Sequence, residues 1–89
     1  MDKLEYNDLF DLLSYGHDAD LEIAGQRFFA EWNGNTIAVY QMNGDSGIEI
    51  ASFGGECKTE AVNALFEFCF IPDKSINNSY PEIKILDIE

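Results

Sequence analysis

The sequence predicts a single α+β domain spanning residues 1–89, in which two helices pack on an antiparallel meander sheet in the order α-β-β-β-β-α-β. Apolar residues recur with a helical period near each end, whereas the stretch between them alternates apolar and polar residues. Glycine-containing turn pairs divide that middle stretch into short segments. A chain of 89 residues has room for one hydrophobic core, so no second domain is expected.

The first helix is predicted over residues 4–15. One helical stripe collects Leu4, Tyr6, Leu9, Leu12 and Leu13. Gly16 follows and favours a left-handed stop.

Strict alternation then predicts two strands joined at Gly25, with the turn formed by Ala24-Gly25 or by Gly25-Gln26. The inward side chains of these strands are Ala19, Leu21, Ile23, Phe28, Ala30 and Trp32, with Trp32 expected in the core. The outward side chains are Asp18, Asp20, Glu22, Arg27, Phe29 and Glu31. Either turn keeps these two faces matched.

Asn33-Gly34 is the strongest hairpin signal and favours a type I′ turn into a strand over residues 35–42, with Ile37 and Val39 inward. A looser five-residue connection, residues 43–47, leads to a fourth strand that places Ile48 and Ile50 inward.

Gly54-Gly55 ends the fourth strand, and a second helix is predicted to start at Cys57 or Thr59 and to end before Pro72. Its buried face comprises Val62, Leu65, Phe66 and Cys69. The polar residues 73–80 are predicted to form a loop. A last strand carries Ile83, Ile85, Leu86 and Ile88, and Pro81 suits its first position or a sheet edge.

Charge limits the partners more sharply than any motif does. Seventeen acidic residues against five basic ones give a net charge of −12, which repels nucleic-acid phosphates and anionic lipid head groups. Direct nucleic-acid binding and membrane binding are therefore not expected. Because 46% of residues are hydrophobic, the acidity does not indicate disorder.

The sequence predicts a cytoplasmic protein without enzymatic activity, metal or cofactor. No apolar run follows the charged amino terminus as a secretory signal would require, so Cys57 and Cys69 are expected to stay reduced. His17 is the only histidine and is interpreted as ordering the turn after the first helix. The carboxylates of Asp18, Asp20 and Glu22 repeat every ~6.7 Å along one strand, a spacing that does not converge on a cation.

Two outward surfaces are candidates for binding a protein partner. The acidic one comprises Asp18, Asp20, Glu22 and Glu31. The apolar one comprises Phe29, Ala38, Tyr40, Met42, Ala51 and Phe53. A solvated sheet face is rarely so apolar, and three covers are considered: a second copy in a two-fold homodimer, which we place slightly ahead, a helix crossing the face, or a partner.

Residues 11–22, the turn after them and the run Arg27-Phe28-Phe29 resemble small uncharacterised acidic proteins of Gram-positive bacteria and their phages or mobile elements. The resemblance covers the first third of the chain, and Ala24 stands where that pattern has an asparagine. It implies no activity and transfers no site residue. Size, layout and acidity are also similar to those of DNA-mimic anti-CRISPR proteins and nuclease inhibitors, an analogy of fold and charge alone.

The leading hypothesis is a small acidic protein-binding module that docks on a basic partner, as an inhibitor or nucleic-acid mimic that occupies the partner's nucleic-acid site. The alternative is a structural or accessory protein that self-associates through the aromatic sheet face. An enzyme ranks third.

Overall fold

The computed structural model describes residues 6–72, 74–76 and 83–89, and within them it contains two helices and seven strands. In chain order these are α1 Tyr6–Ser14, β1 Ala19–Ile23, β2 Gln26–Asn33, β3 Thr36–Asn43, β4 Ser46–Gly54, α2 Lys58–Glu67, β5 Cys69–Ile71, β6 Lys74–Ser75 and β7 Lys84–Ile88. The predicted α+β order is confirmed, and the short β5–β6 hairpin is an addition to it. Leu4 and Pro81 lie outside the described residues.

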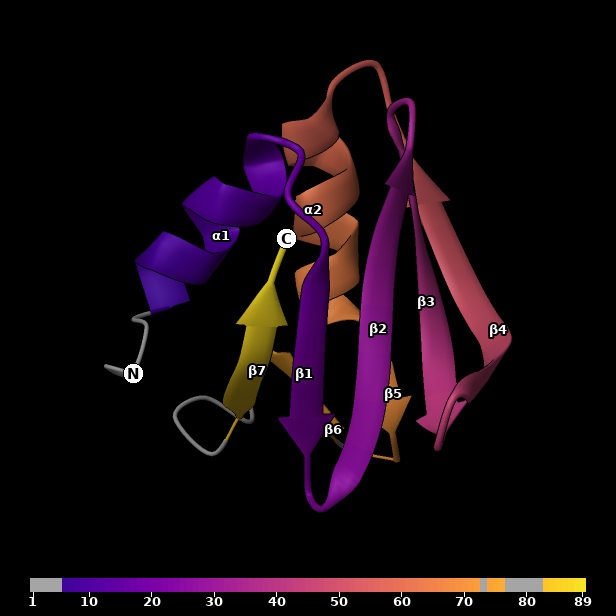
Figure 1. The fold of residues 1–89 in the computed structure, drawn as a ribbon. Helices are drawn as coiled ribbons and strands as arrows, with labels where there is room; N and C mark the ends of the chain where they lie inside the picture. Colours follow the sequence, from indigo (N-terminus) through magenta and orange to yellow (C-terminus); the bar gives the residue numbers. More distant parts are fainter. Residues whose placement is uncertain (1–5, 73, 77–82) are drawn as a thin grey trace.

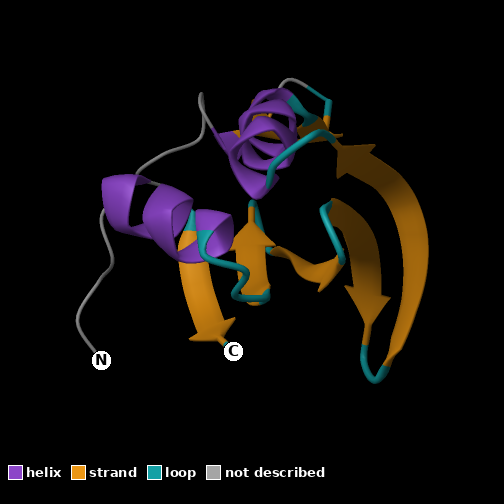
Figure 2. Ribbon diagram, turned by 90° about the horizontal axis from the view of Figure 1, so that it is seen from above, coloured by secondary structure: helices purple, strands orange, loops and turns teal. Residues whose placement is uncertain are grey.

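Five strands form one antiparallel sheet in the order β4-β3-β2-β1-β7. The sheet curves round α2, and both helices lie on the same side of it (Figures 1 and 2). We call that side the concave face and the other the convex face. Buried residues of α1 and α2, including Leu9, Leu13, Leu65 and Phe66, share one core cluster with the concave face. Neither helix therefore covers the convex face.

Helix α1 ends as its sequence predicts. Gly16 adopts a positive φ of 101°, its N–H donates to the carbonyl of Leu13, and the N–H of His17 donates to the carbonyl of Leu12. These two bonds form a Schellman motif, which satisfies carbonyls that the last turn would otherwise leave unpaired. The phenyl rings of Phe10 and Phe66 pack edge-on with their centroids 5.3 Å apart, and this contact joins α1 to α2. Neither of the two described helices has the length and apolar character needed to span a membrane.

The turn between β1 and β2 is Ala24-Gly25, because Ile23 pairs with Gln26. Both turn residues have positive φ, 52° for Ala24 and 80° for Gly25, as a type I′ turn requires. Left-handed backbone costs an ordinary L-residue about 1–2 kcal/mol, so Ala24 is a strained position.

Replacing Ala24 by asparagine, which tolerates this backbone, is expected to raise the free energy of unfolding by about 0.5–1 kcal/mol. Urea unfolding followed by circular dichroism measures it. Gly25→Ala is the matched control: no atom lies within 4 Å of the added Cβ, so backbone strain alone should lower stability. A neutral or destabilising Ala24→Asn would contradict the assignment of strain to this turn.

The next two hairpins differ from the prediction: the first turn is shifted by one residue, and the second is shorter than expected. Asn33 pairs with Thr36, so the turn is Gly34-Asn35 rather than Asn33-Gly34, and Gly34 alone takes a positive φ, 65°. A glycine in the first central position is the pattern of a type II′ turn. Asn43 pairs with Ser46, so the expected five-residue connection is the two-residue turn Gly44-Asp45.

Strand β4 contains a bulge that changes its faces. Val39 pairs with Ala51 but Tyr40 pairs with Glu49, which leaves Ile50 as the extra residue. The bulge shifts the alternation by one, so Ala51 and Phe53 lie on the concave face beside Val39 and Ile37. Their predicted outward orientation was wrong. Ile48 lies on the concave face as predicted, yet it is 74% exposed.

The second helix is shorter than predicted because the chain turns extended at Phe68, whose backbone has φ −70° and ψ 133°. Val62, Leu65 and Phe66 are buried as predicted, but Cys69 lies in β5 and is exposed. Phe70, next to it, is buried and meets the ring of Phe28 edge-on at 5.1 Å. The β5–β6 hairpin thus covers part of the concave face.

Trp32 occupies the predicted face but is not a core residue. Its side chain is partly buried and packs against the rim of the core, with the Lys58 ammonium 5.1 Å from the ring centroid. The same ammonium donates to the carbonyl of Gly34 at 2.8 Å and to Oδ1 of Asn35 at 3.0 Å. Lys58 therefore joins the start of α2 to the β2–β3 turn.

Candidate interaction surface

A row of four side chains crosses the middle of the convex face. Asp20 pairs with Phe29, Phe29 with Tyr40, and Tyr40 with Glu49, so the row runs from β1 to β4. Neighbouring strands lie about 4.8 Å apart, which makes the row ~14 Å long. Phe29 and Tyr40 are partly buried and Glu49 is exposed. We call these four residues the convex row: two aromatic rings with a carboxylate at each end.

Ala38 and Met42 flank Tyr40 on β3, and Glu31 pairs with Ala38 from β2. Both flanking side chains are partly buried, whereas Glu31 is exposed. Opposite Met42 lies Gly47, where a Cβ would come within 2.8 Å of the methionine sulfur. Phe29, Tyr40 and Met42 thus share the predicted apolar surface. Phe53 does not, because it packs against Phe68 on the other face with ring centroids 5.4 Å apart.

Asp20 is held by Arg27 in a two-pronged ion pair. Arg27 Nε donates to Oδ1 at 2.9 Å, and Nη2 donates to Oδ2 at 2.6 Å. Asp20, through these hydrogen bonds first and its charge second, raises the pKa of Arg27 above the ordinary value, so the guanidinium stays charged. The side chain of Asp20 is only 13% exposed. Arg27 therefore largely neutralises the charge of Asp20, and the exposed carboxylate at this end of the sheet is that of Asp87, which pairs with Asp20 from β7.

Asp18, which directly precedes β1, and Glu22 of β1 also have partners. Oδ1 of Asp18 accepts a hydrogen bond from the backbone N–H of Trp32 at 2.9 Å. Oε2 of Glu22 lies 3.8 Å from the ammonium of Lys84 in an exposed pair. Of the predicted acidic residues, Glu31 alone is exposed without an ion pair to any described residue, and Glu49 joins it from β4.

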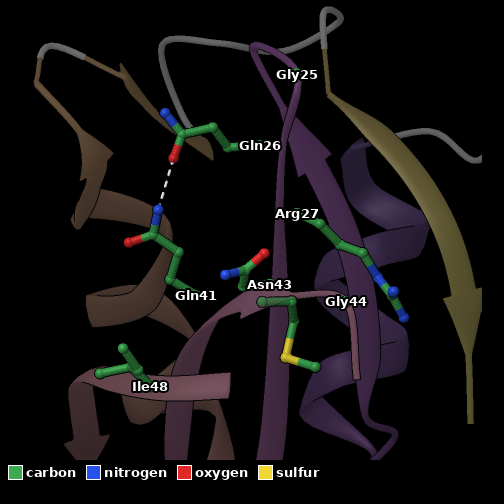
Figure 3. Close-up of a pocket in the computed structure, with 8 residues that line it drawn as sticks. Gly25, Gln26, Arg27, Gln41, Asn43, Gly44 and Ile48 are labelled. Carbon is green, nitrogen blue, oxygen red and sulfur yellow. Dashed lines mark hydrogen bonds between the residues drawn. The ribbon is translucent and has the colours of Figure 1, made fainter. Parts of the chain in front are cut away.

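A hollow of about 490 Å³ opens at the end of the sheet where the β1–β2 and β3–β4 turns lie (Figure 3). Gln26 and Gln41 meet across it, with Nε2 of Gln41 donating to Oε1 of Gln26 at 2.8 Å. Ile48 adds an apolar wall, while the side chain of Arg27 points away from the amide pair (Figure 3). The hollow has no group that could act as a nucleophile or a base.

His17 lies at the junction of α1 and β1, where a turn-ordering role is predicted. Its Nδ1 is 3.3 Å from the carbonyl oxygen of Glu89, and the N–H of Glu89 donates to the carbonyl of Asp18 at 2.9 Å. These contacts connect the start of β1 to the residue after β7. Among residues 6–72, 74–76 and 83–89, no three histidine, cysteine or acidic side chains gather as metal ligands would.

Sequence reasoning placed Asp20, Phe29 and Tyr40 on one face correctly, and the inward assignment of Ile48 also put Glu49 there. It missed the hydrogen bond that the Asp18 side chain accepts within the sheet. The alternation of residues 18–32 and of residues 35–42, joined by a tight hairpin, predicts this shared face. The hydrogen bond from Trp32 to Asp18 joins residues 14 apart, and no local pattern marks it.

Comparisons with family models, curated proteins and solved structures give no match for this chain.

Proposed function

We propose that this chain is a small acidic protein-binding module, without catalytic activity of its own, that docks on a basic protein partner through its convex face. The convex row is the observation that carries the proposal. An arginine or lysine side chain can lay its stem or guanidinium on an aromatic ring while its charge meets a carboxylate. Two exposed carboxylates lie beside these rings: Glu49 pairs with Tyr40, and Glu31 follows Phe29 on the same face of β2.

Charge complementarity favours a basic partner over a second copy of the chain. Each copy carries a net charge of −12, so pairing two convex faces would bring like charges together. A basic protein surface gains from the same field, mainly as a faster encounter. Occupation of the partner's nucleic-acid site is the inhibitory outcome that we propose for such docking.

The test uses immobilised protein and a decaarginine peptide as the probe, with association and dissociation rates measured at low and physiological salt. Glu31→Gln/Glu49→Gln should slow association about fivefold at low salt, because it removes the two exposed carboxylates closest to the aromatic rings of the convex face. Glu60→Gln/Glu67→Gln is the matched control: it removes equal charge from exposed positions of α2. Its effect should stay below about twofold.

Tyr40→Ser leaves the charge unchanged and should speed dissociation about tenfold, because the cation loses its aromatic contact. Equal slowing by both double variants would mean that net charge alone attracts the probe and would overturn the docking surface. Sedimentation of the wild-type chain at micromolar concentration tests the second copy: a dimer that Tyr40→Ser dissociates would contradict a partner-binding convex face.

A further inference from the structure

Strand β4 is an open edge of the sheet. It pairs with β3 on one side, and no described element pairs with the other (Figure 1). Every second residue of an edge strand directs its backbone N–H and C=O away from the sheet. These groups are a template for another extended chain.

The two edges of the sheet differ in how they are protected. Strand β7 has five residues, a bulge at Leu86, and the charged residues Lys84 and Asp87. Strand β4 has nine residues with Glu49 as its single charge. Its own bulge at Ile50 leaves the stretch Ser46–Glu49 regularly paired and exposed on both faces. Charges, short length and bulges are the usual protection against strand pairing, so Ser46–Glu49 is the less protected edge.

A strand added beside Ser46–Glu49 would carry side chains of two kinds. On the convex face it would extend the convex row by one position, next to Glu49, where a cation fits. On the concave face it would lie beside Ile48, which is 74% exposed and lines the hollow, so an apolar side chain fits there. A second copy would bring another Glu49 instead of a cation.

We propose that the Ser46–Glu49 edge binds an extended segment of the basic partner in which cationic and apolar residues alternate, as a sixth strand of the sheet. This inference rests on the proposed function for the charge of the partner, and it adds the backbone contact through which that partner is held.

The probe is the capped peptide (Lys-Val)₄, titrated into ¹⁵N-labelled protein. Binding should shift the amide signals of residues 46–49 and slow their hydrogen exchange, because their outward groups enter a ladder. A peptide with N-methyl groups on one central lysine and the adjacent valine has the same charge but lacks one donor on each edge. Its Kd should be at least about tenfold weaker.

Glu49→Gln should weaken binding of (Lys-Val)₄ severalfold, whereas Asp87→Asn, which removes equal charge from the β7 edge, should change it by less than about twofold. Equal affinity for the N-methylated peptide, protection confined to other strands, or no binding would overturn strand addition. If methylation has no effect but Tyr40→Ser still speeds release of decaarginine, the edge proposal fails and the convex face stands. The reverse pattern leaves the edge and rejects the convex face.

Discussion

Replacing Phe28 by alanine is expected to lower the free energy of unfolding by roughly 3–5 kcal/mol. The side chain is 1% exposed and lies on β2, in the middle of the sheet. Its neighbours on the concave face are Leu21 across β1 and, edge-on, the ring of Phe70 in β5. Truncation would open a cavity where the sheet meets the β5–β6 hairpin. Domains of this size have little stability in reserve, so the variant should be largely unfolded near 37 °C.

Urea and thermal unfolding followed by circular dichroism measure the loss. Phe28→Leu keeps most of the volume and should cost less than about 1.5 kcal/mol. Tyr15→Ala removes an aromatic ring that is 79% exposed and should stay within about 0.5 kcal/mol of wild type. If Phe28→Ala cost no more than Tyr15→Ala, the packing of Phe28 between the concave face and the β5–β6 hairpin would not stabilise the fold.

The faces of the first three strands could be predicted because a register shift of two residues leaves every side chain on the same face of the sheet. The structure pairs Trp32 with Ile37, whereas a turn at Asn33-Gly34 would pair Trp32 with Asn35. Ile37 and Val39 point inward in both registers. The observed turn also has a tertiary contact that no local pattern marks: the Lys58 ammonium donates to the carbonyl of Gly34 and to Oδ1 of Asn35 from 23 or more residues away.

The prediction for the faces of the fourth strand was wrong because a bulge adds one residue and thereby moves every following side chain to the opposite face of the sheet. Regular alternation puts Ile48 and Ile50 on one face of the strand and Ala51 and Phe53 on the other, so an unbroken strand cannot bury both pairs. Two adjacent apolar residues, Ile50 and Ala51, where the two pairs meet, are the local trace of the bulge. Phe68, which lies outside the strand, packs on Phe53 and so favours the pair Ala51 and Phe53 on the concave face.

The sequence also predicted a second helix that is too long, again because two periods overlap. Cys69 continues the helical spacing of Val62, Leu65 and Phe66, but Phe66, Phe68 and Phe70 also follow a period of two. The extended reading is the one that lets Phe68 pack on Phe53 and Phe70 on Phe28. Period alone cannot choose between them, because both place apolar side chains inward.

Asp18→Ala is expected to cost about 1–3 kcal/mol, because it leaves the backbone N–H of Trp32 without an acceptor in a partly buried position. The sequence placed Asp18 among the outward carboxylates that bind a partner. In the structure its Oδ1 is 2.9 Å from that N–H, while its backbone carbonyl accepts from Glu89. Asp18 therefore joins β1 to β2 and to the end of β7, and a loss of partner binding on its removal would not by itself report a contact.

Asp18→Asn separates the structural role from the charge, because the amide oxygen still accepts the hydrogen bond while the negative charge is lost. Its cost should be about 1 kcal/mol or less, since a hydrogen bond to a neutral acceptor is weaker than one to a carboxylate. Asp11→Ala, an exposed position on α1, should stay within about 0.5 kcal/mol of wild type. Equal losses for Asp18→Ala and Asp18→Asn in urea unfolding would show that the charge of Asp18, rather than its bond to Trp32, stabilises the sheet. Association rates of decaarginine with the folded Asp18→Asn variant should match wild type within about twofold, because the exposed carboxylates nearest to Phe29 and Tyr40 are those of Glu31 and Glu49.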